Sequence, residues 1–279
     1  MPSSEAIATP RGGGLNRRGS ILLDAARLQV IVIGALMMRE LHTRYGRENL
    51  GFLWMVMEPM LFCLGVVIIW SVGQGQYTHG SLAVTAFTMT GYLPLTLWRH
   101  ISNRAVHCFR ANATLMYHRQ VRMLDLLSAR VILEIYGTAI AYLVMGFAFW
   151  ALGFYEWPRD WGLFYLGWFY FIVFSAAMGL IVGSLTEMYE WTEKMVGPMM
   201  YFMLPVCGCF FMVDWLPGYL QQYALYIPTV NAFELIRSGQ FGPGVRAHYD
   251  LELVSYTCFS LLALGLLLCR NVHKHLVIE

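Results

Sequence analysis

The sequence predicts an all-α integral membrane protein with six transmembrane helices, an N-terminal interfacial helix and short re-entrant helices before the last span. Three observations support this fold class. Of the 279 residues, 58% are hydrophobic and only 13% are charged, whereas roughly a quarter of a soluble protein is charged. Six apolar blocks reach the length of about 20 residues that a helix needs to cross the hydrocarbon layer. The basic residues gather in the links on one side of those blocks.

The N-terminal region divides into two parts. Residues 1–20 are polar and rich in Gly and Arg, so we expect a flexible cytoplasmic tail and no cleavable signal peptide. Residues 21–49 contain an apolar stretch between Arg27 and Arg39. At ~1.5 Å per residue this stretch is too short to cross a core of ~30 Å. We therefore predict a helix that lies in the cytoplasmic interface, followed by a charged gate region.

Residues 50–279 form the predicted transmembrane domain with six helices. We expect its spans at about 51–73, 82–103, 131–153, 161–185, 196–216 and 251–269. Of the 19 Lys and Arg residues, 16 lie before the first span, in or beside the links after the second and fourth spans, and after the sixth. Because cytoplasmic loops carry the excess of Lys and Arg, we predict that both termini are cytoplasmic.

The link between the second and third spans mixes apolar and basic side chains. A short helix of this kind suits docking onto a protein partner with an acidic rim. The alternative is a solvated loop that binds anionic lipid head groups. The docking candidates are Leu115, Met116, His118, Arg119, Arg122 and Met123.

The link before the last span, residues 215–249, is too apolar for a loop in water and is broken by Pro217, Pro228 and Pro243. We expect re-entrant outer helices at about 217–239, with their ends covered by protein.

No catalytic, cofactor or metal site is expected in this chain. Neither Lys194 nor Lys274 follows a glycine, so the sequence has no phosphate-binding P-loop and no route to ATP hydrolysis through one. The motifs HExxH, GxSxG and paired CxxC do not occur either. The six cysteines lie in or beside apolar runs, where they are interpreted as small hydrophobic residues.

Two motifs carry a resemblance to a known family. They are RELHTRYGRENLGFLWMVMEPM at 39–60, which leads into the first span, and NAFELIRSGQFG at 231–242, before the last. Their order around six spans resembles the membrane subunit of ABC-2-type polysaccharide exporters, especially the capsular-polysaccharide branch. The resemblance implies a non-enzymatic permease in a bacterial inner membrane that exports lipid-linked polysaccharide from the cytoplasm to the periplasm.

The same resemblance implies partners and moving parts. It implies a homodimer bound to two copies of a P-loop ATPase, which holds the ATP and Mg that this chain does not bind. Export proteins of the periplasm and outer membrane are further expected partners, and nucleic acid is not. By analogy, 111–127 is the coupling helix that rests on the ATPase, 22–48 lies beside a lateral opening, and 217–239 caps the outer end of the pathway.

The charge cluster before the first span is the candidate substrate gate. Guanidinium groups match the oxygens of phosphate and acidic sugars. The gate candidates are Arg39, Arg44, Tyr45 and Arg47. The alternative is ordinary anchoring by positive residues at the inner interface, with Glu40 and Glu48 as local partners.

A route for a sugar polymer needs a wet passage with flat aromatic surfaces. The route candidates are Trp54, Glu58, Tyr92, Trp98, Arg99, Arg104, Tyr201 and Phe202. For the aromatic candidates the alternative is lipid contact or helix packing. Glu58 is expected either to pair with Arg99 or Arg104 or to face water along the route.

Two other functions stay open from the sequence. One is an exporter of the same fold that carries O-antigen, a drug or another lipid. The other is a membrane-embedded enzyme, which would need His, Asp and Glu side chains at one depth. Glu58, Glu134 and Asp214 fall at different heights in the predicted topology, which argues against the enzyme.

Overall fold

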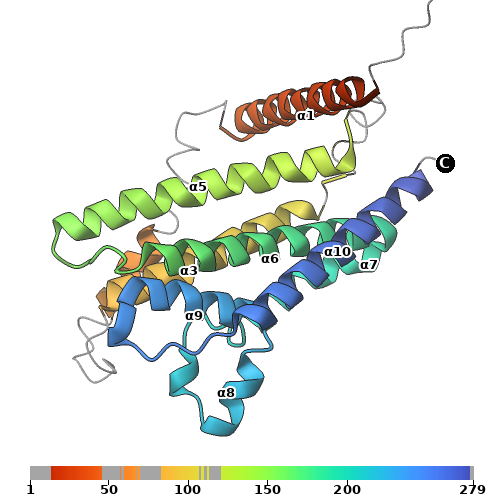
Figure 1. The fold of residues 1–279 in the computed structure, drawn as a ribbon. Coiled ribbons are helices and arrows are strands. Elements are labelled where there is room, and N and C mark those ends of the chain that lie inside the picture. Colours follow the sequence, from red (N-terminus) through yellow and green to blue (C-terminus); the bar gives the residue numbers. More distant parts are fainter. Residues whose placement is uncertain are drawn as a thin grey trace, which may run out of the picture.

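The computed structural model describes most of the chain and is helical throughout its regular parts (Figure 1). The structure describes residues 14–45, 57, 60–66, 68–69, 83–106, 108–109, 112 and 121–276. In the first of these ranges the side chains are described only for 24–43, and in the last only as far as 272. The α-helices are α1 (Gly14–Tyr45), α3 (Val84–Ala105), α5 (Met123–Ala151), α6 (Trp161–Met188), α7 (Glu190–Met203), α8 (Gly218–Ala224), α9 (Pro228–Phe241) and α10 (Leu251–Leu276). Two 3-10 turns, η2 (Val213–Trp215) and η3 (Gly242–Gly244), flank α8 and α9. The all-α prediction is confirmed.

Helix α6 is the central element and packs against α3, α9 and α10. It begins where Asp160 Oδ1 accepts hydrogen bonds from the backbone N–H groups of Gly162 and Leu163, at 2.9 and 3.1 Å. This is the usual role of Asp before the first turn of a helix. A Cβ atom on Gly167 would lie 2.6 Å from the backbone N of Ile236 on α9. Glycine therefore lets α6 and α9 pack backbone to backbone.

Three helices in the described part of the chain are long and apolar enough to cross a membrane. They are α5, α6 and the Leu251–Val272 portion of α10. The expected second span coincides with α3 to within two residues. Most of the expected first span, 51–73, lies outside the described residues, so the count of six spans stays a prediction.

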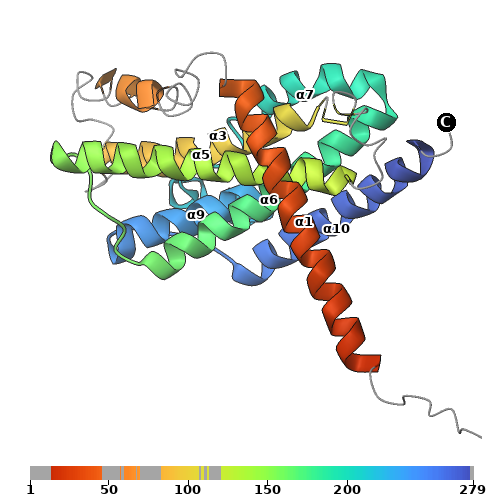
Figure 2. The same cartoon turned by 90° about the horizontal axis from the view of Figure 1, so that it is seen from above.

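Helix α1 crosses α5 at a steep angle (Figure 2). Leu36 is 9% exposed where the helices meet, and Gln29 Nε2 donates to Asp125 Oδ1 at 3.0 Å. Leu28 and Val30 remain exposed on α1, as suits a helix lying in a membrane interface. The helix begins at Gly14 and thus takes in the end of the stretch predicted to be a flexible tail.

The prediction of a fifth span as one helix over 196–216 is wrong. Helix α7 ends at Met203, and a 14-residue helix covers only about 21 Å of a core of ~30 Å. After it the chain runs through turns, and Gly208 adopts a φ of +88°. That left-handed conformation is one that residues other than glycine rarely adopt.

The predicted boundary between the coupling helix, 111–127, and the third span, 131–153, is also wrong. Helix α5 begins at Met123 rather than near 131, because the backbone N–H of Arg122 donates to Asp125 Oδ2 at 3.1 Å and fixes its first turn. Residues 123–127 therefore belong to α5. Met123 is 4% exposed and packs in the core, which contradicts its assignment to ATPase docking, whereas Arg122 is exposed. The other docking candidates, Leu115, Met116, His118 and Arg119, lie outside the described residues.

Candidate functional site

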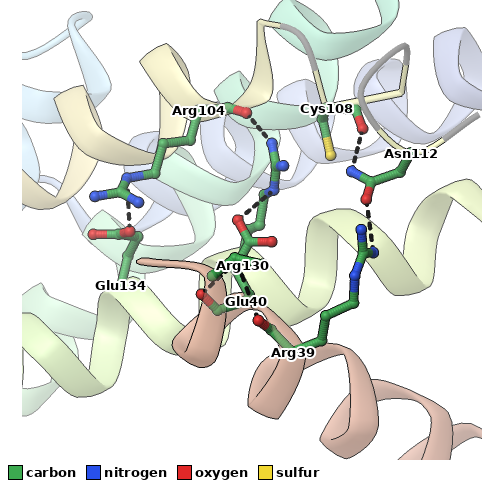
Figure 3. Close-up of polar contacts among 8 residues, drawn as sticks. Arg39, Glu40, Arg104, Cys108, Asn112, Arg130 and Glu134 are labelled. Atoms are coloured by element: carbon green, nitrogen blue, oxygen red, sulfur yellow. Dashed lines mark hydrogen bonds and ion pairs between the residues drawn. The ribbon is translucent and has the colours of Figure 1, made fainter. Parts of the chain in front are cut away.

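Polar side chains gather where α1 meets α3 and the first turns of α5 (Figure 3). We call this set the α1 junction, and its members are Arg39, Glu40, Arg104, Asn112, Arg130 and Glu134. All three arginines belong to the side of the chain that the charge distribution predicts to be cytoplasmic. The junction therefore lies at the end of the bundle where the predicted gate and the predicted coupling segment come together.

Arg39 joins α1 to the connection that follows α3. Its Nη1 donates to Asn112 Oδ1 at 2.9 Å, and Asn112 Nδ2 donates to the carbonyl oxygen of Cys108 at 2.8 Å. Asn112 is 4% exposed, so these bonds hold its amide in place. Arg39 itself is exposed, and a guanidinium group has five N–H donors, of which this hydrogen bond uses one. The residue can therefore hold the connection and still present donors to an anion.

Arg130 joins three elements through one guanidinium group. Its Nε lies 3.2 Å from Glu40 Oε1 on α1, and its Nη1 donates to the carbonyl oxygen of Arg104 in the last turn of α3. The side chains of Arg130 and Glu40 are 15% and 20% exposed, so water screens this ion pair only in part. The planar guanidinium suits such bridging because its donors point in fixed directions.

Glu134 is a buried carboxylate that ties α5 to α3. It is 1% exposed, and its two oxygens lie 2.9 Å from Arg104 Nε and 3.3 Å from His100 Nδ1. His100 and Arg104 stand one turn apart on the same face of α3, so both reach it. A buried carboxylate requires partners of this kind. Arg104 is thus paired with Glu134 in this structure, while the proposed Glu58 pairing falls on a residue outside the described part of the chain.

The sequence contained a signal for Glu134 that the prediction of the site did not use. A single carboxylate inside a predicted apolar span calls for a partner within the protein. Asn112 carried no comparable signal, because its role depends on where α1 is placed.

The predicted route residues separate into buried and exposed groups. Trp98 is 1% exposed, and its ring packs 5.6 Å from that of Phe174 in the core, so its assignment to a passage is wrong. Tyr92 stacks on Phe62 with ring centroids 3.8 Å apart. Both contacts are the helix packing that was the alternative for these aromatic residues.

The structure brings two route candidates together on the surface of α7. The guanidinium carbon of Arg99 on α3 lies 5.6 Å from the centre of the Tyr201 ring, a cation–π contact. Tyr201 is 66% exposed and its neighbour Phe202 is 77% exposed. Their role in a route stays a prediction. Trp54, Glu58 and Arg47 lie outside the described residues, as do the side chains of Arg44 and Tyr45.

A second polar cluster, centred on α9, holds the loops at the opposite end of the bundle. Arg237 is fully buried, and it donates to the carbonyl oxygens of Gly208, Cys209 and Phe211 while lying 4.1 Å over the Phe87 ring on α3. Glu234, one turn earlier on α9, accepts the backbone N–H groups of residues 213 and 248, both at 3.0 Å. Polar residues of the motif at 231–242 thus hold the surrounding loops in place through hydrogen bonds to their backbone.

Comparison with known proteins places this helical chain in a family. Residues 32–241, from the middle of α1 to the end of α9, match the ABC-2 type transporter family. The chain therefore belongs to that family of membrane proteins.

Among individual proteins, the chain is similar to the capsule polysaccharide export inner-membrane protein CtrC of Neisseria meningitidis serogroup A. The two are 38% identical over 252 residues, which cover 90% of this chain and 95% of CtrC. The capsule polysaccharide export inner-membrane protein BexB of Haemophilus influenzae is 36% identical over 247 residues, or 88% of this chain and 93% of BexB. The polysialic acid transport protein KpsM of Escherichia coli is 28% identical over 242 residues, or 85% of this chain and 93% of KpsM.

Proposed function

We propose that this chain is the membrane permease subunit of an ATP-driven exporter that moves lipid-linked capsular polysaccharide from the cytoplasm to the periplasm. The observation that carries the proposal is the similarity to CtrC and BexB over nearly the whole length of each protein, because both are named for capsule polysaccharide export at the inner membrane. The family match supports the transport role, and a chain without a P-loop needs a separate ATPase as its source of energy.

In this proposal the α1 junction transmits force. The ATPase binds the connection between α3 and α5, and its closure on ATP pushes that connection toward the membrane. The Arg39–Asn112 hydrogen bond attaches the connection to α1, and the Arg130–Glu40 ion pair attaches the start of α5 to α1. A movement of the connection therefore reaches the interfacial helix directly, without passing through the packed core.

The gate then acts beside the moving helix. Exposed donors of Arg39, together with Arg44 and Arg47, bind phosphate or acidic sugar groups of the lipid-linked substrate. We propose that both termini are cytoplasmic, and that two copies of this chain work with two ATPase subunits. The exposed aromatic side chains of Tyr201 and Phe202 on α7 are then covered by the second copy or contact the polymer.

Two experiments test the proposal. Gentle purification from native membranes should recover a P-loop ATPase in equal amount and a glycolipid, both identified by mass spectrometry. Expression in a capsule-forming strain that lacks its own permease should restore polysaccharide on the surface of intact cells. Recovery of the chain without an ATPase, or of small hydrophobic cargo or O-antigen in place of capsule, would contradict the assignment.

A charge reversal tests the docking side separately. Arg122→Glu should reduce surface polysaccharide and raise the intracellular pool, because Arg122 is exposed on the connection that the ATPase is proposed to bind. Arg159→Glu is the matched control, since Arg159 is 58% exposed in the loop at the opposite end of α5. Equal export by both variants and by the wild type would show that the connection is not the docking site.

A further inference from the structure

A groove separates α5 from α6 in the half of the bundle next to the loop at 152–160. Both helices pack against α3, and Leu97 of α3 forms the floor between them. Ala139 and Leu143 of α5 form one wall, and Trp161 and Trp168 of α6 form the other. The groove holds about 320 Å³, close to the smaller ligand pockets of proteins, which begin at roughly 300 Å³.

The lining of this groove offers water almost nothing to bind. It consists of aliphatic side chains and aromatic rings, and the rings of Trp157 and Trp161 stack at a centroid distance of 6.3 Å. The hydroxyl group of Tyr142, a lining residue, already bonds to Tyr155 and Gln240, at 2.7 and 3.3 Å. A water molecule needs several polar partners to be stable inside a protein. An apolar occupant therefore suits the groove better than water does.

The position of the groove indicates what that occupant is. Both walls belong to helices that are long and apolar enough to cross a membrane. From Trp161 to Ile172 the α6 wall covers roughly 16 Å along the helix axis, at ~1.5 Å per residue. That is about half of a hydrocarbon core of ~30 Å. The end beside the loop is rich in Trp, which favours the boundary between membrane and water. The groove thus has the direction and length of one lipid chain in one leaflet.

We propose that the groove is a binding site for one acyl chain of a membrane phospholipid, in the leaflet on the side of the 152–160 loop. The topology of the proposed function makes this the periplasmic leaflet, while the site itself rests only on the geometry and the membrane location. The bound chain fills the space between two helices that touch each other little. It thereby supports α5, which carries Arg130 and Glu134 of the α1 junction.

Photochemical labelling tests this site. The intact chain is reconstituted into vesicles of phosphatidylethanolamine and phosphatidylglycerol that contain a phospholipid with a diazirine midway along one acyl chain, and no glycolipid. After irradiation, mass spectrometry locates the labelled residues. We expect the adducts to concentrate at 135–143 and 161–172. Labelling spread over the exposed apolar side chains of α10 in proportion to their area would overturn the proposal.

Two substitutions on α5 sharpen the test. Ala139 is exposed and lines the groove, so Ala139→Phe should fill it and remove most of the adducts there. Val144→Phe is the control, because Val144 is 45% exposed but does not line the groove. Unchanged labelling in Ala139→Phe would overturn the proposal. So would labelling by a lipid-linked glycan with a photoreactive tail but not by the phospholipid, since the occupant would then be the substrate. The positions of the adducts do not depend on capsule export in cells. The lipid site and the proposed function can therefore be refuted independently of each other.

Discussion

Replacing Glu134 with glutamine isolates the contribution of the buried carboxylate in the α1 junction. Glu134→Gln keeps the size and shape of the side chain and removes its negative charge. In the wild type the two carboxylate oxygens lie 2.9 Å from Arg104 Nε and 3.3 Å from His100 Nδ1. The amide of the variant has a single oxygen in place of two, and because that oxygen is uncharged it accepts a weaker hydrogen bond than the carboxylate does.

The size of the effect follows from the exposure of the partners. A hydrogen bond to a charged group contributes about 1.5–3 kcal/mol, and breaking a fully buried ion pair costs about 3–5 kcal/mol. Arg104 is 34% exposed, so water compensates for part of its lost partner. We therefore expect Glu134→Gln to lower the free energy of unfolding by about 2 kcal/mol. For a chain of this length that is a fall of roughly 4–8 °C in the apparent melting temperature.

The cysteines of this chain provide the assay. All six are free and buried, so a maleimide dye that fluoresces on reacting with thiols reports unfolding during a temperature ramp in detergent. The apparent melting temperatures of variant and wild type are compared at one heating rate, because membrane proteins unfold irreversibly under these conditions.

Glu156→Gln is the matched control. Glu156 is 77% exposed, and its ion pair with Arg159 lies on the surface, so its loss should change stability by less than about 0.5 kcal/mol. If Glu134→Gln melts within about 1 °C of the wild type, the carboxylate does not hold α3 and α5 together as described.

Other changes probe the rest of the structure. Glu40→Gln and Arg130→Gln should each reduce capsule export, and the double variant should export little less than either single variant, because both substitutions remove the same ion pair. A double-mutant cycle on the free energy of unfolding should show a coupling of about 1 kcal/mol. Gly167→Ala should lower the melting temperature by several degrees, because its new methyl group would meet the α9 backbone. Arg237→Lys should speed the reaction of Cys209 with a thiol reagent, because a lysine ammonium group cannot bond to all of the loop carbonyl oxygens at once.

Controls and contrary outcomes are available for each of these changes. Gly197→Ala should not lower the melting temperature, since nothing lies within 4 Å of the added Cβ atom and alanine favours a helix over glycine. Equal effects at Gly167 and Gly197 would contradict the close approach of α6 and α9. Strictly additive losses for Glu40 and Arg130 would contradict their pairing. Unchanged reactivity of Cys209 would show that Arg237 does not hold the loop.

The elements predicted best from the sequence are those with local signals at both ends. Helix α6 begins at the predicted residue because Asp160 caps it, and a largely apolar run carries it to Leu185, the predicted end, three residues before the helix stops at Met188. The start of α5 was missed because Asp125 was assigned to the predicted coupling helix and Arg130 to the link before the third span. Glu134 fell inside that predicted span, with no partner assigned to it. Each of them has a polar partner within the protein, and those partners come from α1 and α3. Hydropathy alone does not reveal such pairing.

The failure at the predicted fifth span has a different cause. Its apolar composition predicts a helix, but Arg237 donates hydrogen bonds to carbonyl oxygens of the 208–211 turn. In a continuing helix these oxygens would accept backbone N–H groups instead. The competing donor is far away in the sequence, so no local pattern reveals it. The candidate site shows the same limit. Arg39 was identified from its position in a charged motif, whereas its partner Asn112 became apparent only once α1 was placed across α5.

The 208–211 turn depends on the guanidinium group of Arg237, and this dependence affects the order in which the chain can fold during synthesis. The acceptors of Arg237 precede it by 26 to 29 residues, so they emerge from the ribosome well before their donor. Backbone groups without hydrogen bonds are costly inside a bilayer. The insertion machinery or water must therefore shelter this turn until α9 has been synthesised. A nascent chain halted before Arg237 would be an open intermediate that quality-control proteases can recognise.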